Sequence, residues 1–378
     1  MKRILFTTVL LVAILTVNAQ LYKISAELTG FPDHSKFYLK DLTANENVDS
    51  AEIIGGKFIM KGKISDIKNF WLYNSSKTKY SYTNLTIGAD QISVKGDIKD
   101  FPFDLSITGS PSQDVANKLN LQTKALWKKR DSVVEILMPL AMGELQNDSI
   151  KRITKPLSRQ LKQIDSATDL IGRKFIAENL NSYSAVQELY YQRNKFAIED
   201  FKKLFDQVKE PYKSWSFGAR IANYIKVGNP LKKGDDFFDF EAPDLKGQKY
   251  KVSAFKGKYI LLDFTETYCG PCILAAENLK KIASKYPEQL QIITFYAETN
   301  KRVMQEGLFR DQFKWPTIWD GKGTYSEITL KYGVEGYPTF VLIDPNGKVV
   351  SKVVGFGKEE NGKGNIENVI DRILLKTK

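Results

Sequence analysis

Residues Leu262–Cys272 read LDFTETYCGPC, and this stretch decides the fold. An apolar run of strand length, Tyr259–Phe264, ends shortly before the chain's two cysteines, which Gly270 and Pro271 separate. Proline suits the first turn of a helix, where its missing N–H leaves no hydrogen bond unmade. The stretch therefore predicts a buried strand, a short loop and a helix that begins at the cysteines and runs to Tyr286.

This arrangement gives the two cysteines different tasks. Cys269 falls at the helix N-terminus, where unpaired N–H groups and the helix dipole stabilise a thiolate. Cys272 follows one turn later, close enough for a disulfide but buried behind the first sulfur. We interpret Cys269 as a nucleophile and Cys272 as the resolving thiol of a redox disulfide. A structural bridge is the weaker alternative, because so short a loop restricts the unfolded chain little.

The N-terminus has the pattern of a secretory signal peptide. Lys2 and Arg3 precede an apolar run, Val9–Val17, and Val17 and Ala19 fit the small-residue cleavage pattern. The run is shorter than the roughly 20 residues needed to cross a membrane. We predict a signal peptide over 1–19 that is cleaved after Ala19. No cysteine stands at the cut, so the mature protein is expected to be periplasmic or otherwise extracytoplasmic and not a lipoprotein.

The composition of the chain limits which metal, cofactor and nucleic-acid sites it can form. The chain has 378 residues, which suggests two or three domains, and a net charge of +12. With two cysteines and one histidine, His34, it lacks the ligands of a structural zinc site, and Ile273 after Cys272 excludes a haem-attachment motif. We therefore expect no metal and no cofactor. The basic residues are mixed with acidic ones rather than with aromatic side chains, so no nucleic-acid partner is expected.

Residues 20–110 alternate apolar and polar side chains with period two, as in Ile24, Ala26 and Leu28. Gly55-Gly56 offers the positive φ angles of a tight hairpin. We predict an all-β accessory domain, a sandwich or small barrel of about seven or eight strands. His34 is expected in a solvated turn.

Residues 111–231 have a longer period. Leu119, Leu126 and Val133 are seven apart, and similar spacings recur later, which predicts amphipathic helices that pack on their neighbours. A coiled-coil dimer is the alternative, but the heptads are not sustained. Pro139 and Pro156 are expected to mark helix breaks or first turns.

Residues 232–378 alternate strands and helices, which predicts a mixed sheet covered by helices. A second buried strand is expected at Leu290–Ala297. Asn346-Gly347 between Thr339–Asp344 and Val349–Val354 is a strong hairpin signal, and Gly364–Leu375 is expected to form the last helix.

Three segments of the C-terminal part resemble a known protein family. Leu262–Cys272 resembles the active-site segment of thioredoxin-fold proteins, and Phe240–Leu245 and Tyr332–Thr339 resemble the exported TlpA/ResA branch. The match covers about Asp235 to Leu375. More loosely, the N-terminal β module and the helical middle resemble an uncharacterised extension in some Gram-negative secreted proteins. The resemblance implies a C-terminal α/β thioredoxin fold.

The resemblance also assigns the site. It implies that Cys269 attacks, that Cys272 resolves, and that Pro338 is cis and faces the disulfide. A cis peptide bond is rare, so one beside a reactive disulfide points to function. The expected substrate-binding residues are Tyr268, Gly270, Pro271, Tyr337 and Pro338.

Asp263 matches the buried acid of thioredoxin. In an apolar strand its pKa should be raised, which suits it to move the proton of Cys272. The alternative is an ordinary hydrogen-bonded aspartate at a strand edge. The chain departs from the family pattern where Thr265 and Tyr268 replace tryptophans. It departs again where Ala275 replaces a glutamate of the TlpA/ResA branch, and Glu277 lies two positions too late to take its role.

Together these features predict an extracytoplasmic thiol–disulfide oxidoreductase that acts on protein cysteines. Its Gly-Pro dipeptide favours a reductant over an oxidant. The expected partners are protein dithiol or disulfide clients and a membrane-linked electron donor. The alternatives are a non-catalytic client-binding protein and a peroxiredoxin-like peroxide reductase, although Glu266 stands where the latter needs Thr or Ser.

Overall fold

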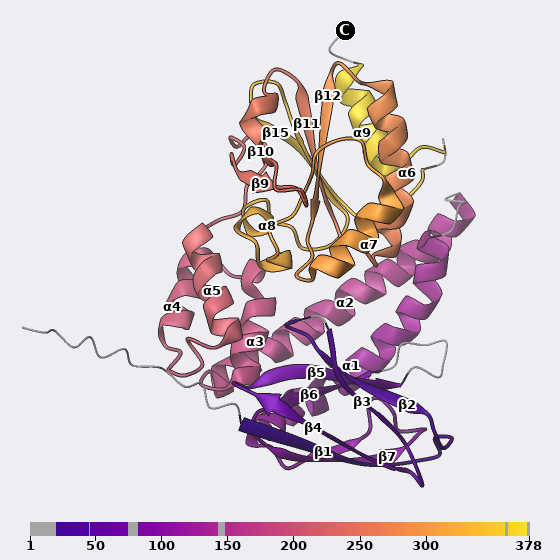
Figure 1. Ribbon diagram of the computed structural model, residues 1–378, viewed down its shortest axis with the longest axis vertical. Helices are drawn as coiled ribbons and strands as arrows, with labels where there is room; N and C mark the ends of the chain where they lie inside the picture. The colour runs from indigo at the N-terminus through magenta and orange to yellow at the C-terminus, as the bar shows by residue number, and fades with distance from the viewer. Residues whose placement is uncertain (1–19, 45, 75–81, 143–147, 360–361, 376–378) are drawn as a thin grey trace, which may run out of the picture. The chain divides into compact units, whose positions relative to one another are not determined.

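The computed structural model describes residues 20–44, 46–74, 82–142, 148–359 and 362–375 (Figure 1). The expected signal peptide, 1–19, lies outside the described residues. The chain divides into two compact units. The first contains the described residues up to Leu42 together with Asn47–Asp114, and the second contains Thr43–Glu46 and the chain from Val115.

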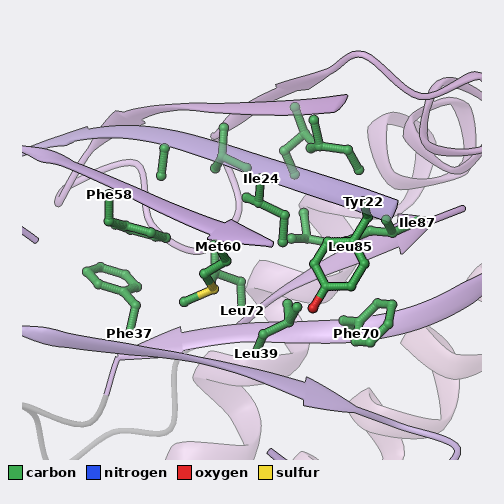
Figure 2. Packing of buried hydrophobic residues seen from close by; sticks show 14 of the residues in the cluster. Tyr22, Ile24, Phe37, Leu39, Phe58, Met60, Phe70, Leu72, Leu85 and Ile87 are labelled. Atoms are coloured by element: carbon green, nitrogen blue, oxygen red, sulfur yellow. The ribbon is translucent and has the colours of Figure 1, made fainter. Parts of the chain in front are cut away.

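The first unit is all β. Its strands are β1 (Gln20–Thr29), β2 (Lys36–Asp41), β3 (Glu46–Glu52), β4 (Lys57–Ile64), β5 (Lys68–Asn74), β6 (Tyr82–Ile87), β7 (Gln91–Asp97) and β8 (Ser106–Thr108). They form two four-stranded sheets, with the orders β4-β1-β7-β8 and β3-β2-β5-β6. The alternating apolar residues meet in one core between the sheets (Figure 2). This confirms the all-β prediction for the N-terminal part of the chain.

Two local predictions for this unit also hold. Gly55 and Gly56 have φ angles of 57° and 74°, as the turn between β3 and β4 requires. His34 lies in a turn with φ 67°, and its exposed ring forms a 3.1 Å contact with Glu52.

The middle of the chain is helical, as predicted. It contains α1 (Pro111–Met142), α2 (Asp148–Asn179), α3 (Tyr183–Tyr191), the short turn η1 (Arg193–Lys195), α4 (Ile198–Asp206) and α5 (Ser216–Val227). The expectation for the prolines is wrong. Pro139 and Pro156 both lie inside helices, α1 and α2 respectively. The helical spacing of apolar residues continues on both sides of Pro156, and α2 tolerates the loss of the one backbone hydrogen bond that the proline cannot donate.

The C-terminal part has a thioredoxin-like α/β fold. Its strands are β9 (Glu241–Pro243), β10 (Lys249–Lys251), β11 (Tyr259–Thr265), β12 (Leu290–Tyr296), β13 (Thr317–Ile318), β14 (Thr339–Ile343) and β15 (Val349–Val354). Its helices are η2 (Val252–Phe255), α6 (Gly270–Lys285), α7 (Lys301–Asp311), η3 (Gly323–Tyr325), α8 (Glu327–Lys331) and α9 (Asn365–Leu374). The main sheet has the order β13-β12-β11-β14-β15. The pairs β11–β12 and β12–β13 are parallel, and the pairs that involve β14 are antiparallel.

Side chains alternate between the two faces of this sheet. Leu261 packs with residues of α6 and α9 on one face, while Leu262 packs with residues of β9 and α8 on the other. Asp263 therefore points to the face that α6 covers. None of the described helices is both long and apolar enough to cross a membrane.

Candidate active site

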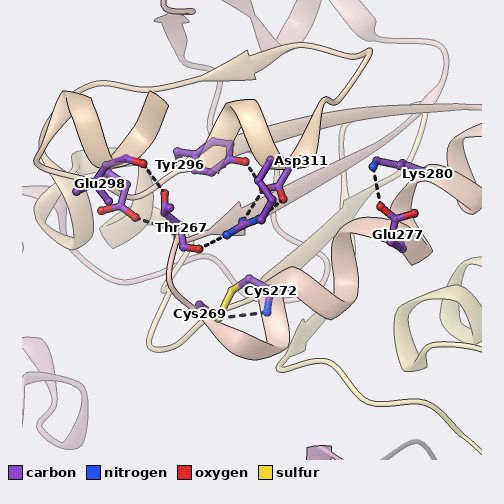
Figure 3. Close-up of polar contacts among 10 residues, drawn as sticks. Thr267, Cys269, Cys272, Glu277, Lys280, Tyr296, Glu298 and Asp311 are labelled. Carbon is purple, nitrogen blue, oxygen red and sulfur yellow. Dashed lines mark hydrogen bonds and ion pairs between the residues drawn. A yellow bond between two sulfur atoms is a disulfide. The ribbon is translucent and has the colours of Figure 1, made fainter. Parts of the chain in front are cut away.

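The cysteine pair lies where the sequence predicts, at the start of α6. Cys269 is the N-cap residue, Pro271 lies in the first turn, and the two cysteines form a disulfide with their Cα atoms 5.2 Å apart. The N–H of Cys272 points to the Cys269 sulfur at 3.3 Å (Figure 3). Cys272 is only 4% exposed. The outer sulfur thus receives the helix N–H, which would stabilise a thiolate there, while the second sulfur is buried.

Asp263 is a buried carboxyl in the middle of the sheet. It lies in β11, which pairs with β12 on one side and β14 on the other, so it is not at a sheet edge. It is 2% exposed, and the Thr294 hydroxyl donates a hydrogen bond of 2.9 Å to it. Burial raises the pKa of Asp263 to about 7, and the nearby Asp311 contributes in the same direction. The expected raised pKa is confirmed.

The loop before Cys269 is fastened at Thr267, which is 1% exposed. Its main-chain N–H donates to Glu298 Oε1 at 2.7 Å, and its hydroxyl donates to the Val303 carbonyl at 3.0 Å (Figure 3). Arg310 Nη1 donates to the Thr267 carbonyl. Residues from the end of β12 and from α7 therefore hold the main chain two positions before the attacking cysteine.

The same helix continues this network into the core. Arg310 donates from Nε and Nη2 to the carboxylate of Asp311, at 2.6 and 2.8 Å. Asp311 is 4% exposed and also accepts from the Tyr296 hydroxyl (Figure 3). Since Asp311 is one of the groups that raise the pKa of Asp263, the Arg310–Asp311 pair links the loop to the buried acid.

Tyr268 is the exposed member of the loop. It is 70% exposed, and its hydroxyl donates to the Glu306 carboxylate of α7. That hydrogen bond raises the pKa of Tyr268. The ring beside Cys269 is thus accessible to a large partner.

The Tyr337-Pro338 peptide bond is cis, as the resemblance implies. Pro338 is buried, and its carbonyl accepts from Gly355 N–H at 2.7 Å. Within the described chain, the main-chain groups of Tyr337 form no hydrogen bond. They are therefore available to pair with an added extended segment.

The structure also shows where the residues that depart from the family pattern lie. Ala275 is buried under the sheet, and Glu277 lies on the surface of α6, where it pairs with Lys280 at 2.7 Å (Figure 3). Sequence reasoning missed Glu298 and Arg310, which reach Thr267 across 31 and 43 residues. No local sequence pattern indicates that charged residues so far along the chain contact Thr267.

Comparisons with known proteins agree with this geometry. The Redoxin family model matches residues 232–370, and a domain of unknown function, DUF4369, matches residues 22–116. Thiol-disulfide oxidoreductase ResA of Bacillus cereus is 30% identical over 151 residues, which are 40% of this chain and 83% of that protein. The chain belongs to the ResA family of thioredoxin-like thiol–disulfide oxidoreductases.

Two further known proteins are similar to part of this chain. Thioredoxin-like protein YneN of Bacillus subtilis is 28% identical over 147 residues, 38% of this chain and 82% of that protein. The crystal structure of the thioredoxin domain of a thiol-disulfide oxidoreductase from Bacteroides vulgatus is 23% identical, with a TM-score of 0.34, over 38% of this chain and 98% of that one. As a family member, this chain is a thiol–disulfide oxidoreductase.

Proposed function

We propose that the protein is an exported reductant of disulfides in client proteins, with Cys269 and Cys272 as its catalytic dithiol. The observation that carries the proposal is the cysteine pair at the N-terminus of α6, on the sheet face to which buried Asp263 also points. The Gly-Pro dipeptide between the cysteines, which resembles that of thioredoxin, supports the reducing direction.

The reaction takes place in two exchanges. The Cys269 thiolate attacks one sulfur of the client disulfide, so a mixed disulfide forms and the other client sulfur leaves as a thiolate. Asp263 then takes the proton of Cys272, whose thiolate attacks the Cys269 sulfur and releases the second client thiol. The client gains two electrons and two protons, and the enzyme is left as the Cys269–Cys272 disulfide. A membrane-linked dithiol donor reduces it again.

The surface around the pair would bind the client. Tyr268 gives an exposed ring, Gly270 and Pro271 separate the two cysteines at the start of α6, and Tyr337 offers free main-chain groups next to Pro338. An extended client segment would pair with Tyr337 as an added strand, which presents its cysteine to Cys269.

We also propose export and a four-part organisation. Residues 1–19 are a cleaved signal peptide, 20–110 an accessory β domain, 111–231 a helical segment and 232–378 the thioredoxin-like domain. The charged start and short apolar run of the first residues support export to the periplasm or another extracytoplasmic space. N-terminal sequencing of the exported protein should begin at Gln20, and retention of Met1 to Ala19 would contradict export.

The direction of catalysis is tested by the reduction potential of the full mature chain, equilibrated with glutathione. A reductant should lie near the value of thioredoxin, about −270 mV, whereas a value near −120 mV would indicate an oxidant. Insulin disulfide reduction should proceed in the same preparation. Hydrogen peroxide consumption without insulin reduction would support the peroxide-reductase alternative instead, and neither activity would support the binding-protein alternative.

A further inference from the structure

The helical segment contacts the connection that leads to the cis proline. This connection runs from Tyr325, through α8, to Pro338. Near its end, Asn194 of η1 donates to the Glu335 carboxylate at 3.0 Å and accepts from the Tyr224 hydroxyl of α5 at 3.0 Å. One amide therefore ties the residue three positions before Pro338 to the helices.

A second contact holds the start of the same connection. The guanidinium of Arg220 in α5 lies over the Tyr325 ring, 3.4 Å from its centroid, and the Tyr190 ring of α3 lies 5.8 Å from it. Asn223 also donates to the Tyr325 carbonyl at 3.3 Å. Cations over aromatic rings are attracted by the ring quadrupole, most strongly where water is excluded. Arg220 and Asn194 thus fasten the connection at both ends.

The residue before the cis proline, Tyr337, is also near the helical segment. The Tyr337 hydroxyl is buried and has no hydrogen-bond partner among the described residues. Burial, the carboxylates of Glu266 and Glu298, and the hydroxyls of Tyr190 and Tyr325 raise its pKa. Tyr337 is therefore near both Glu266 of the active-site loop and Tyr190 of the helical segment.

We propose that the helical segment sets the affinity of the enzyme for protein clients, with Arg220 and Asn194 as positioning residues that act through the connection 325–338. The occupant of the surface is an extended client segment with a cysteine, which pairs with the main chain of Tyr337. This inference rests on the proposed function. A small disulfide reacts with the cysteine pair alone, whereas a peptide must also pair with Tyr337 in the connection 325–338. Comparing the two substrates therefore distinguishes an effect on client binding from an effect on the chemistry at the cysteines.

The test compares Arg220→Met with wild type in the full mature chain. One substrate is a decapeptide that carries its cysteine in a mixed disulfide with glutathione, and the other is hydroxyethyl disulfide. For the peptide we expect KM to rise about tenfold with kcat unchanged, and for the small disulfide we expect no change in rate. Arg220→Lys keeps a cation over Tyr325 and should restore most of the affinity.

A matched control removes a similar contact elsewhere in the helical segment. The Lys213 ammonium lies 5.3 Å from the centroid of the Phe205 ring of α4, so Lys213→Met removes a cation–aromatic contact that involves neither the connection nor η1. It should leave both KM values unchanged. Asn194→Ala should raise KM for the peptide in the same direction as Arg220→Met.

Two results would overturn the inference while the proposed function stands. In the first, Arg220→Met and Asn194→Ala have the same KM for the peptide as Lys213→Met. In the second, they lower kcat equally for both substrates, as a general structural defect would. If the wild-type chain reduces neither substrate, the proposed function itself fails and the inference fails with it.

Discussion

The Thr294 hydroxyl donates a 2.9 Å hydrogen bond to the Asp263 carboxyl across the parallel pairing of β11 and β12. One hydrogen bond does not offset burial, which raises the pKa of Asp263 to about 7. The acid therefore changes its protonation near neutral pH, where a proton acceptor for Cys272 is most useful.

Asp263→Asn should slow release of the mixed disulfide by about 10²-fold near pH 7. The base must be deprotonated, so the wild-type rate should rise with pH through about 7, the pKa of Asp263, and this rise should be absent in the variant. The difference should narrow at higher pH, where Cys272 ionises unaided. Stopped-flow measurement of the release step checks this, and identical pH profiles would contradict the role.

The same substitution should stabilise the fold at alkaline pH. Because the pKa of Asp263 is raised from 3.8 to about 7, the folded state loses stability as pH rises through that window, and the loss is complete above it. At about 1.36 kcal/mol per pKa unit, the upper limit of the penalty is about 4 kcal/mol. Denaturant unfolding should show Asp263→Asn to be more stable than wild type at pH 8 but not at pH 4. Equal stability at pH 8 would argue against a buried, charged Asp263.

Arg310→Met should disturb the active-site loop from α7. The substitution removes the donor to the Thr267 carbonyl and leaves buried Asp311 without its cation, which should cost about 1–3 kcal/mol. Client reduction should slow while the protein remains folded by circular dichroism. Lys249→Met is the control, because Lys249 of β10 is 69% exposed in its pair with Glu241 of β9, away from the active-site loop. Equal activity of the two variants would exclude a positioning role for Arg310.

Asp371 joins α9 to α6. It is 7% exposed and accepts from Lys285, Lys363 and Tyr286, which outweigh burial and hold its pKa at about 2. A lowered carboxyl pKa gives stability that is present above the ordinary value of 3.8 and is lost as pH falls towards 2. Asp371→Asn should therefore destabilise the fold by about 2 kcal/mol at pH 7.

The stability loss in Asp371→Asn should shrink as pH falls below 3.8 and nearly vanish near pH 2, where the Asp371 carboxyl of wild type is itself protonated. Asp236→Asn provides the control, since Asp236 is 80% exposed in its pair with Lys348 and its substitution should change stability by less than about 0.5 kcal/mol. Equal unfolding midpoints for the two variants at pH 7 would contradict the account of Asp371.

The sequence predicted those features that depend on neighbouring residues. The strand, loop and helix around Cys269, the turn at Gly55-Gly56 and the raised pKa of Asp263 all follow from local pattern and burial. The prediction for Pro156 is wrong, since α2 continues through this residue despite the one hydrogen bond that proline cannot donate. The contacts of Arg310 with Thr267 and of Asn194 with Glu335 join residues 43 and 141 positions apart, and only the folded chain brings them together.

The central claim is that Cys269 attacks and Cys272 resolves, and a trapping experiment tests it most directly. The reduced Cys272→Ser chain, mixed with an oxidised client, should accumulate a covalent adduct that dithiothreitol releases, because the attack remains and the release is lost. The Cys269→Ser chain should form no adduct, since Cys272 is only 4% exposed. Mass spectrometry that finds the adduct on Cys269 alone is the predicted result. Adducts through Cys272 in Cys269→Ser, or none in either variant, would contradict the account.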